Sequence, residues 1–178
     1  MRTNETTRIA SDTSRSRRAT QRRWLSVVAG AAIAAGGYVH FCLYRRGYRA
    51  IPKIGTGFLL QVLASAIVAS ALLFIGRERL LRVGRVVVRR SFVVEAFGLA
   101  LSLGTLAAFA ASRTPAGLYG FREGGLQPAP QALVALVAES AALVLLTGAL
   151  ILERRPREPV MLGRPPVASG HTRLFVRK

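Results

Sequence analysis

The chain has 178 residues, of which 51% are hydrophobic, and it has a formal net charge of +18. The basic residues lie in blocks between apolar runs of about 20 residues, a pattern that indicates membrane spans and excludes a soluble domain or a nucleic-acid-binding module. The single cysteine, Cys42, excludes an internal disulfide and any Cys-x-x-Cys zinc or redox motif.

Residues 1–23 are rich in Ser, Thr and Arg and have no apolar periodicity, so they are expected to form a disordered basic N-terminus. The first apolar run, residues 24–44, reaches about 31 Å as a helix, which matches the hydrocarbon core of a bilayer. Trp24 and Tyr44 stand at its two ends, where amphipathic rings prefer the interface. The run also resembles a signal peptide, but it is too long and has no small-residue cleavage site, so a retained helix is predicted.

The second predicted span covers residues 57–76. A basic segment, residues 77–91, follows it and is expected to contact anionic lipid headgroups. A loop is the favoured interpretation of this segment, and an interfacial helix is the alternative. Its arginines are Arg77, Arg79, Arg82, Arg85, Arg89 and Arg90.

The third predicted span covers residues 92–112 and contains Glu95 near its basic end, where local pairing or an extended reach to the interface is expected. The fourth covers residues 130–152 and begins with Pro130, which suits a first helical turn. The proline-rich segment 153–178 is expected to be a disordered tail. The predicted fold class is therefore all-α, a polytopic membrane four-helix bundle with disordered termini.

The distribution of basic residues predicts an orientation. Residues 4–23, 77–91 and 153–172 together have 16 Lys or Arg residues, whereas the other two connections have six. Because basic residues near spans favour the cytoplasmic side, both termini are predicted to be cytoplasmic and the protein is placed in the inner (plasma) membrane.

The two connections on the opposite side are called here the first loop (residues 45–55) and the second loop (residues 113–129). Both contain aromatic and apolar side chains that are unusual in solvated loops, so they are expected to pack over the bundle as a cap. Glu123 is expected to form an ion pair with Arg49, Arg113 or Arg122. The candidate cap residues are Tyr48, Arg49, Pro52, Phe121, Arg122 and Glu123.

These loops also carry a resemblance. Residues 47–55 read Gly-Tyr-Arg-Ala-Ile-Pro-Lys-Ile-Gly after His40, and residues 117–123 read Gly-Leu-Tyr-Gly-Phe-Arg-Glu. The chain resembles, over residues 24–152, a group of uncharacterised small four-transmembrane-helix proteins of high-GC bacteria. The resemblance implies the architecture and no activity.

A few polar residues interrupt the spans, and such residues mark functional sites more often than elsewhere. Glu139 is the deepest, and His40 and Gln61 are expected nearby in the same half of the membrane. One interpretation is a proton or cation site or the floor of a ligand pocket, and the other is a polar clamp between helices. The candidate buried polar cluster is His40, Gln61, Ser65, Glu139 and Ser140.

No catalytic, cofactor-binding or metal-binding set is predicted, because the sequence offers no activated nucleophile and too few metal ligands. The favoured function is a non-enzymatic accessory or scaffolding subunit that contacts a membrane protein partner or a second copy of itself. The alternative is a small transporter or ligand-binding membrane protein with a polar pocket around Glu139. A lipid-acting enzyme is the least favoured hypothesis.

Overall fold

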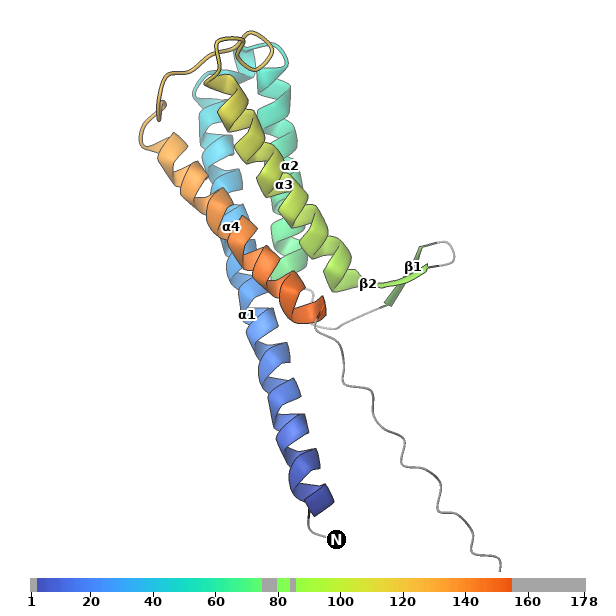
Figure 1. Cartoon of the computed structure of the whole chain (residues 1–178). Helices are drawn as coiled ribbons and strands as arrows, with labels where there is room; N and C mark the ends of the chain where they lie inside the picture. Colours follow the sequence, from blue (N-terminus) through green and yellow to red (C-terminus); the bar gives the residue numbers. More distant parts are fainter. Residues whose placement is uncertain (1–2, 75–79, 84–85, 155–178) are drawn as a thin grey trace, which may run out of the picture.

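The computed structural model describes residues 3–74, 80–83 and 86–154. The described residues form four long helices; a short 3-10 helix connects the first and the second, and a two-stranded sheet connects the second and the third and projects to the side of the bundle (Figure 1). The elements in chain order are α1 (Thr3–Arg45), η1 (Tyr48–Ala50), α2 (Ile54–Phe74), β1 (Leu80–Val83), β2 (Val86–Arg89), α3 (Arg90–Ser112) and α4 (Gln131–Arg154).

Within the described residues, four helices are long and apolar enough to cross a membrane, so the predicted membrane four-helix bundle is confirmed. α1 packs along both α2 and α4, and α3 packs on α4 and α2, so α1 and α3 lie diagonally across the bundle. The end at which residues 46–53 and 113–130 connect the helices is called the loop end, and the opposite end is called the hairpin end.

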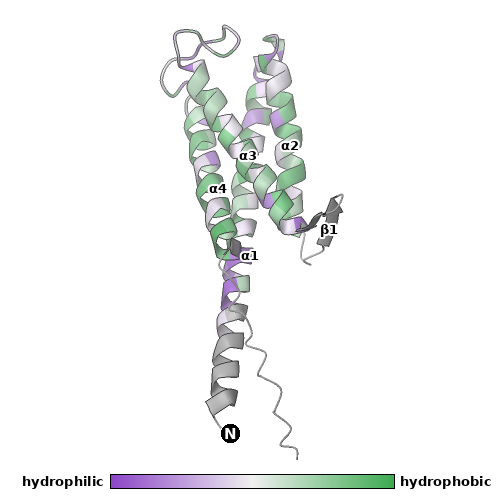
Figure 2. Ribbon diagram, turned by 45° about the vertical axis from the view of Figure 1, so that its right-hand side comes forward, coloured by the Kyte–Doolittle hydropathy of each residue, from purple (hydrophilic) through white to green (hydrophobic). Residues whose placement is uncertain are grey.

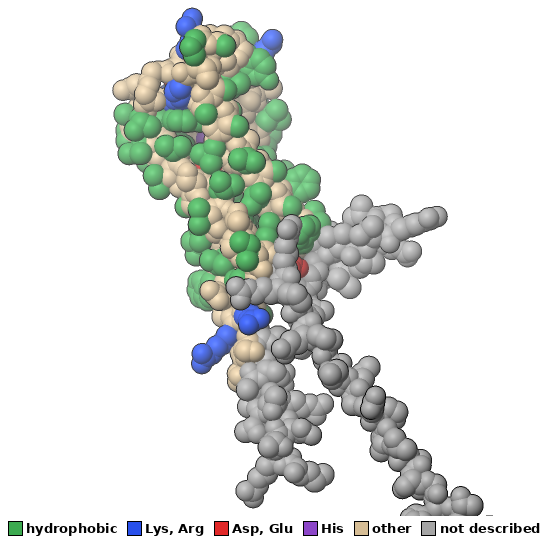
Figure 3. All heavy atoms as spheres, in the orientation of Figure 1, with side chains coloured by type: hydrophobic (Ala, Val, Ile, Leu, Met, Phe, Trp, Pro, Cys, Tyr) green, Lys and Arg blue, Asp and Glu red, His purple; other side chains and the backbone are tan. Residues whose placement is uncertain are grey.

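The apolar side chains lie where a bilayer would contact them. Hydrophobic residues run along the helices within the bundle (Figure 2), and on the face shown in Figure 3 the Lys and Arg side chains lie toward its two ends. Large side chains such as Ile67 and Phe74 point outward, with 70% and 82% of their surface exposed. Lipid-facing positions explain this exposure.

The N-terminal segment differs from its expected disorder, because α1 begins at Thr3 and projects beyond the other helices (Figure 1). Neither glycine nor proline occurs in residues 3–29, so nothing in the sequence interrupts the helix. A helix that extends an existing span also needs no new nucleus. The expected disorder of the C-terminal tail concerns residues 155–178, which lie outside the described residues.

The basic segment after α2 also differs from the expected loop and from the alternative interfacial helix. β1 and β2 pair antiparallel, with Leu80 opposite Arg89 and Val83 opposite Val86. Both strands are rich in branched apolar residues, which favour strands. Residues 77–79 and Arg85 of this segment lie outside the described residues.

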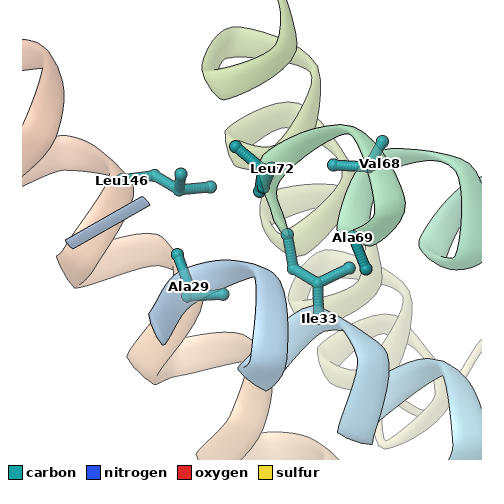
Figure 4. Packing of buried hydrophobic residues seen from close by; sticks show 7 residues of the cluster. Ala29, Ile33, Val68, Ala69, Leu72 and Leu146 are labelled. Carbon is teal, nitrogen blue, oxygen red and sulfur yellow. The ribbon is translucent and has the colours of Figure 1, made fainter. Parts of the chain in front are cut away.

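The core at the middle of the bundle consists of small and branched residues from three helices (Figure 4). Close approach is possible because α3 presents Gly98 at this point, where a Cβ atom would lie 2.9 Å from Leu146 Cδ1. The cluster comprises Ala29, Ile33, Val68, Ala69, Leu72, Ala142 and Leu146.

Candidate functional site

A cavity of about 330 Å³ lies at the loop end, lined by residues of all four helices and both loops. Two glycines leave it open: Cβ atoms added at Gly57 on α2 and Gly104 on α3 would meet no other atom within 4 Å. Most of the wall is apolar, for example Leu43, Phe58 and Leu136. This combination of apolar walls and few polar groups is typical of a binding site for a small molecule.

Three of the predicted polar residues, His40, Gln61 and Glu139, line this cavity. Glu139 is 1% exposed, and Gln61 Nε2 donates a hydrogen bond to its Oε1 at 3.3 Å. His40 Nδ1 lies 2.8 Å from the carbonyl oxygen of Gly36 on α1. Gly36 is also the residue that makes room for the carboxylate, because a Cβ atom there would lie 2.7 Å from Glu139 Oε1.

The two serines of the predicted cluster do not line the cavity. Ser65 is buried against Gly37, where an added Cβ atom would lie 2.6 Å from Ser65 Cβ. Ser140 is half-buried, one residue beyond Glu139 on α4. A serine that was not predicted, Ser102 on α3, is fully buried and contributes to the electrostatic environment of the Glu139 carboxyl group.

The roof of the cavity joins the two loops through Tyr48, whose hydroxyl donates a hydrogen bond to Glu123. The Tyr48 ring stacks on Phe58 at 4.9 Å and meets the edge of Phe121 at 5.9 Å. Burial, and then the hydrogen bond to Glu123, raise the pKa of Tyr48 well above its ordinary value of 10.0. Tyr48 therefore remains a hydrogen-bond donor throughout the physiological pH range.

The ion pair expected at Glu123 forms with Arg113, at 3.4 Å, within the second loop. Arg113 also donates hydrogen bonds to the carbonyl oxygens of Gly125 and Gln127 and lies 3.5 Å from the centre of the Phe109 ring. Arg113 thus holds the second loop in the conformation that presents Glu123 to Tyr48.

Three of the six predicted cap residues are exposed and do not pack over the bundle as expected. Tyr48, Phe121 and Glu123 form the contacts described above, whereas the side chains of the other three are exposed. The prediction grouped neighbours in sequence, but alternate residues of a tight loop point in different directions. The three exposed residues are Arg49, Pro52 and Arg122.

A second buried polar cluster, at the hairpin end, was missed by the sequence analysis. Arg22 Nη2 of α1 donates hydrogen bonds to both carboxylate oxygens of Glu95 at 3.0 Å, and Ser26 Oγ donates to Glu95 Oε1 at 2.8 Å. Arg22 also pairs with Glu153 of α4 at 3.0 Å. Within the described residues, the partners of Glu95 come from α1 and not from the neighbouring residues at which local pairing was expected. Matching the depths of charged residues at the ends of different spans would have indicated this cluster.

The donor sets of these sites differ from those of common metal centres. Within the ranges that the structure describes, no three His, Cys, Asp or Glu side chains lie together.

No protein-family model, curated protein or solved structure matches the chain. The resemblance based on the loop motifs therefore stays a prediction, and the fold and cavity define the class of the protein as a multi-pass membrane four-helix bundle.

Proposed function

We propose that the protein is a non-enzymatic membrane protein that binds a small amphiphilic molecule in the loop-end cavity. The observation that supports this function is the cavity itself, about 330 Å³ in volume and lined largely by apolar side chains. Such a volume lies at the lower end of ligand sites, which suits a molecule of modest size.

The polar groups of the cavity favour a ligand with hydrogen-bonding ends. Glu139, Gln61 and His40 contribute one polar region, and the roof residues Tyr48 and Glu123 contribute the other. Between them the wall offers mainly aliphatic and aromatic contacts. An amphiphile fits this pattern better than an ion or a sugar, because its apolar body gains free energy on leaving water.

This proposal favours the ligand-binding hypothesis over the accessory-subunit hypothesis, because the cavity supports ligand binding with a specific feature. The accessory or scaffolding role stays a prediction. We also propose that the hairpin end faces the cytoplasm of the plasma membrane and that the loop end faces outward. The excess of Lys and Arg in the segments at the hairpin end, 16 against six in the loops, supports this orientation.

Native mass spectrometry of the protein released gently from its host membrane tests the proposal. The wild-type chain should carry a reproducible small added mass. Gly104→Leu should lose that mass, because it adds a large side chain at a residue that lines the cavity and whose Cβ position is free of protein atoms within 4 Å.

Ala107→Leu provides the matched control, because residue 107 is an exposed position on the same helix that does not line the cavity. This variant should retain the added mass. A wild-type protein without any bound mass, or a Gly104→Leu protein that keeps it, would contradict the proposed function.

A further inference from the structure

Three buried oxygen atoms in the bundle make no hydrogen bond within the described part of the chain. They are Glu139 Oε2 on α4, Ser65 Oγ on α2 and Ser102 Oγ on α3. The three residues are between 0% and 1% exposed. Buried polar groups without partners are rare in proteins and each requires an explanation, such as an ion or a water molecule.

The two serines differ from other hydroxyl residues in the helices of this protein. Most helical serines and threonines return the hydroxyl to a backbone carbonyl one turn earlier when no other partner is present. Five residues show such a bond here, whereas Ser65 and Ser102 leave their oxygens available. The five are Thr20, Ser26, Thr105, Ser112 and Thr147.

Two consecutive glycines of α1 show that Ser65 and Glu139 lie at the same depth. A Cβ atom on Gly36 would lie 2.7 Å from Glu139 Oε1, and one on Gly37 would lie 3.2 Å from Ser65 Oγ. Consecutive helical residues differ by about 1.5 Å along the axis, so the two side chains are level. The Ser102 hydroxyl lies within hydrogen-bonding reach of the Glu139 carboxyl group, so the third oxygen belongs to the same region.

We infer that Glu139, Ser65 and Ser102 bind a small monovalent cation with the charge and size of Na⁺. An ionised carboxylate buried in a membrane is costly unless a cation neutralises it, and no Lys or Arg is paired with Glu139 among the described residues. A single carboxylate balances one positive charge, so a divalent ion would leave an excess charge in the bundle.

The donor set also fits an alkali cation. Carboxylate and hydroxyl oxygens are hard ligands, whereas transition metals are selected by imidazole and thiolate groups. The other titratable group close to Glu139 is His40, a half-buried residue on α1. α2 and α3 present Gln61, Ser65 and Ser102 there, none of which is charged.

The cation site shares Glu139 with the cavity but adds Ser65 and Ser102, which do not line it, so variants of the two serines test the cation site separately from the proposed amphiphile. Dicyclohexylcarbodiimide, an apolar reagent that modifies protonated buried carboxyl groups, tests it on the full chain in detergent. Labelling of Glu139 is followed by mass spectrometry in NaCl and in choline chloride of equal ionic strength. Sodium at ten times its dissociation constant should slow labelling about tenfold, because only the unoccupied fraction reacts.

Two variants sharpen the test. Ser65→Ala combined with Ser102→Ala should label readily but lose the protection by sodium, whereas Ser70→Ala, at an exposed position of α2, should keep it. If the rate of Glu139 labelling were equal in sodium and choline and changed with pH alone, Glu139 would bind a proton and not a sodium ion, and the inference would be overturned. Full protection of the double variant by sodium would also overturn it.

A second measurement does not depend on the variants. The thermal midpoint of the wild-type protein should rise when NaCl replaces choline chloride, because a ligand of the folded state stabilises it. An unchanged midpoint at saturating sodium would overturn the inference. Gly104→Leu should retain this sodium response, so a failure of the proposed amphiphile site and a failure of the cation site give different results.

Discussion

Glu95 and Glu139 are almost fully buried, with 2% and 1% of their surface exposed, but their carboxylates have different partners. Glu95 accepts hydrogen bonds from the guanidinium of Arg22 and the hydroxyl of Ser26. Glu139 accepts a hydrogen bond from the amide of Gln61, and no cation is paired with it within the described residues. A buried charge depends on such partners, because the surrounding medium does not screen it. Glu95 therefore links two helices through a buried ion pair, whereas Glu139 is the carboxylate to which we assign the proposed cation.

Arg22→Ala should destabilise the bundle strongly. Removing the guanidinium leaves Glu95 buried without its cation, and breaking a buried pair in this way costs about 3–5 kcal/mol. Equilibrium unfolding in mixed micelles measures the loss, with Arg23→Ala, at an exposed neighbouring position, as the control. If Arg22→Ala unfolded like the control, the tie between α1 and α3 would not contribute to stability.

Tyr48 should ionise only at a pH well above its ordinary pKa of 10.0. Its pKa is raised in the folded state, so the stability it provides is fully present below pH 10.0 and is lost only as pH passes the higher folded-state value. Phenolate absorbance should show a late component that Tyr48→Phe removes and that Tyr119→Phe, at a position 73% exposed, retains. A single titration shared by all tyrosines would show that the bond to Glu123 does not hold the loops together.

At the scale of elements, α1 is the helix against which both α2 and α4 pack, and Gly36 and Gly37 permit the contact. They accept Glu139 of α4 and Ser65 of α2 against the backbone of α1. Such small surfaces let helices pack closely in lipid, where dispersion contacts favour association. The polar region around Glu139 therefore depends on two positions that themselves have no side chain.

Gly37→Ala should separate α1 from α2. The new Cβ atom would lie 2.6 Å from Ser65 Cβ, and overpacking of this kind costs roughly 1–3 kcal/mol. Gly104→Ala, where nothing lies within 4 Å, should instead stabilise its helix by up to about 1 kcal/mol. Thermal unfolding of the two variants compares these effects. A Gly37→Ala protein as stable as the Gly104→Ala protein would show that the α1–α2 interface accommodates the added methyl group without cost.

Hydropathy predicted the positions of the helices, because a bilayer imposes both length and apolarity on each span. It did not predict how each helix is turned about its axis, so Arg22 was not matched to Glu95, 73 residues away. Ser102 was missed for the same reason, since a serine within a span is unremarkable until its neighbours are known. The polar composition of residues 3–23 predicted disorder, although a helix can continue from a span without a core of its own.

At the scale of the whole molecule, polar contacts link the elements at each end of the bundle, and an apolar core lies between the two ends. Arg22 joins α1, α3 and α4 at the hairpin end, whereas Tyr48 joins the two loops at the loop end. The cavity lies beneath the hydrogen bond between Tyr48 and Glu123. Loosening the loop end therefore should open the cavity while the hairpin end keeps the helices assembled.

The proposed orientation predicts the labelling pattern of single cysteines in intact cells. In a Cys42→Ser background, Tyr119→Cys should react with a membrane-impermeant maleimide, because residue 119 is exposed in the second loop. Ser16→Cys, also exposed, should react only after the membrane is opened. The reverse pattern would place the loop end in the cytoplasm.

The length of α1 has a mechanical consequence. Its 43 residues extend about 65 Å, roughly twice the hydrocarbon thickness of a bilayer. Sharp kinks in helices have specific causes such as proline, and residues 3–29 contain neither proline nor glycine. The projecting part and the part inside the bundle therefore form one continuous helix. A rotation of the projecting part about the helix axis would be transmitted along it toward Gly36, against which Glu139 packs.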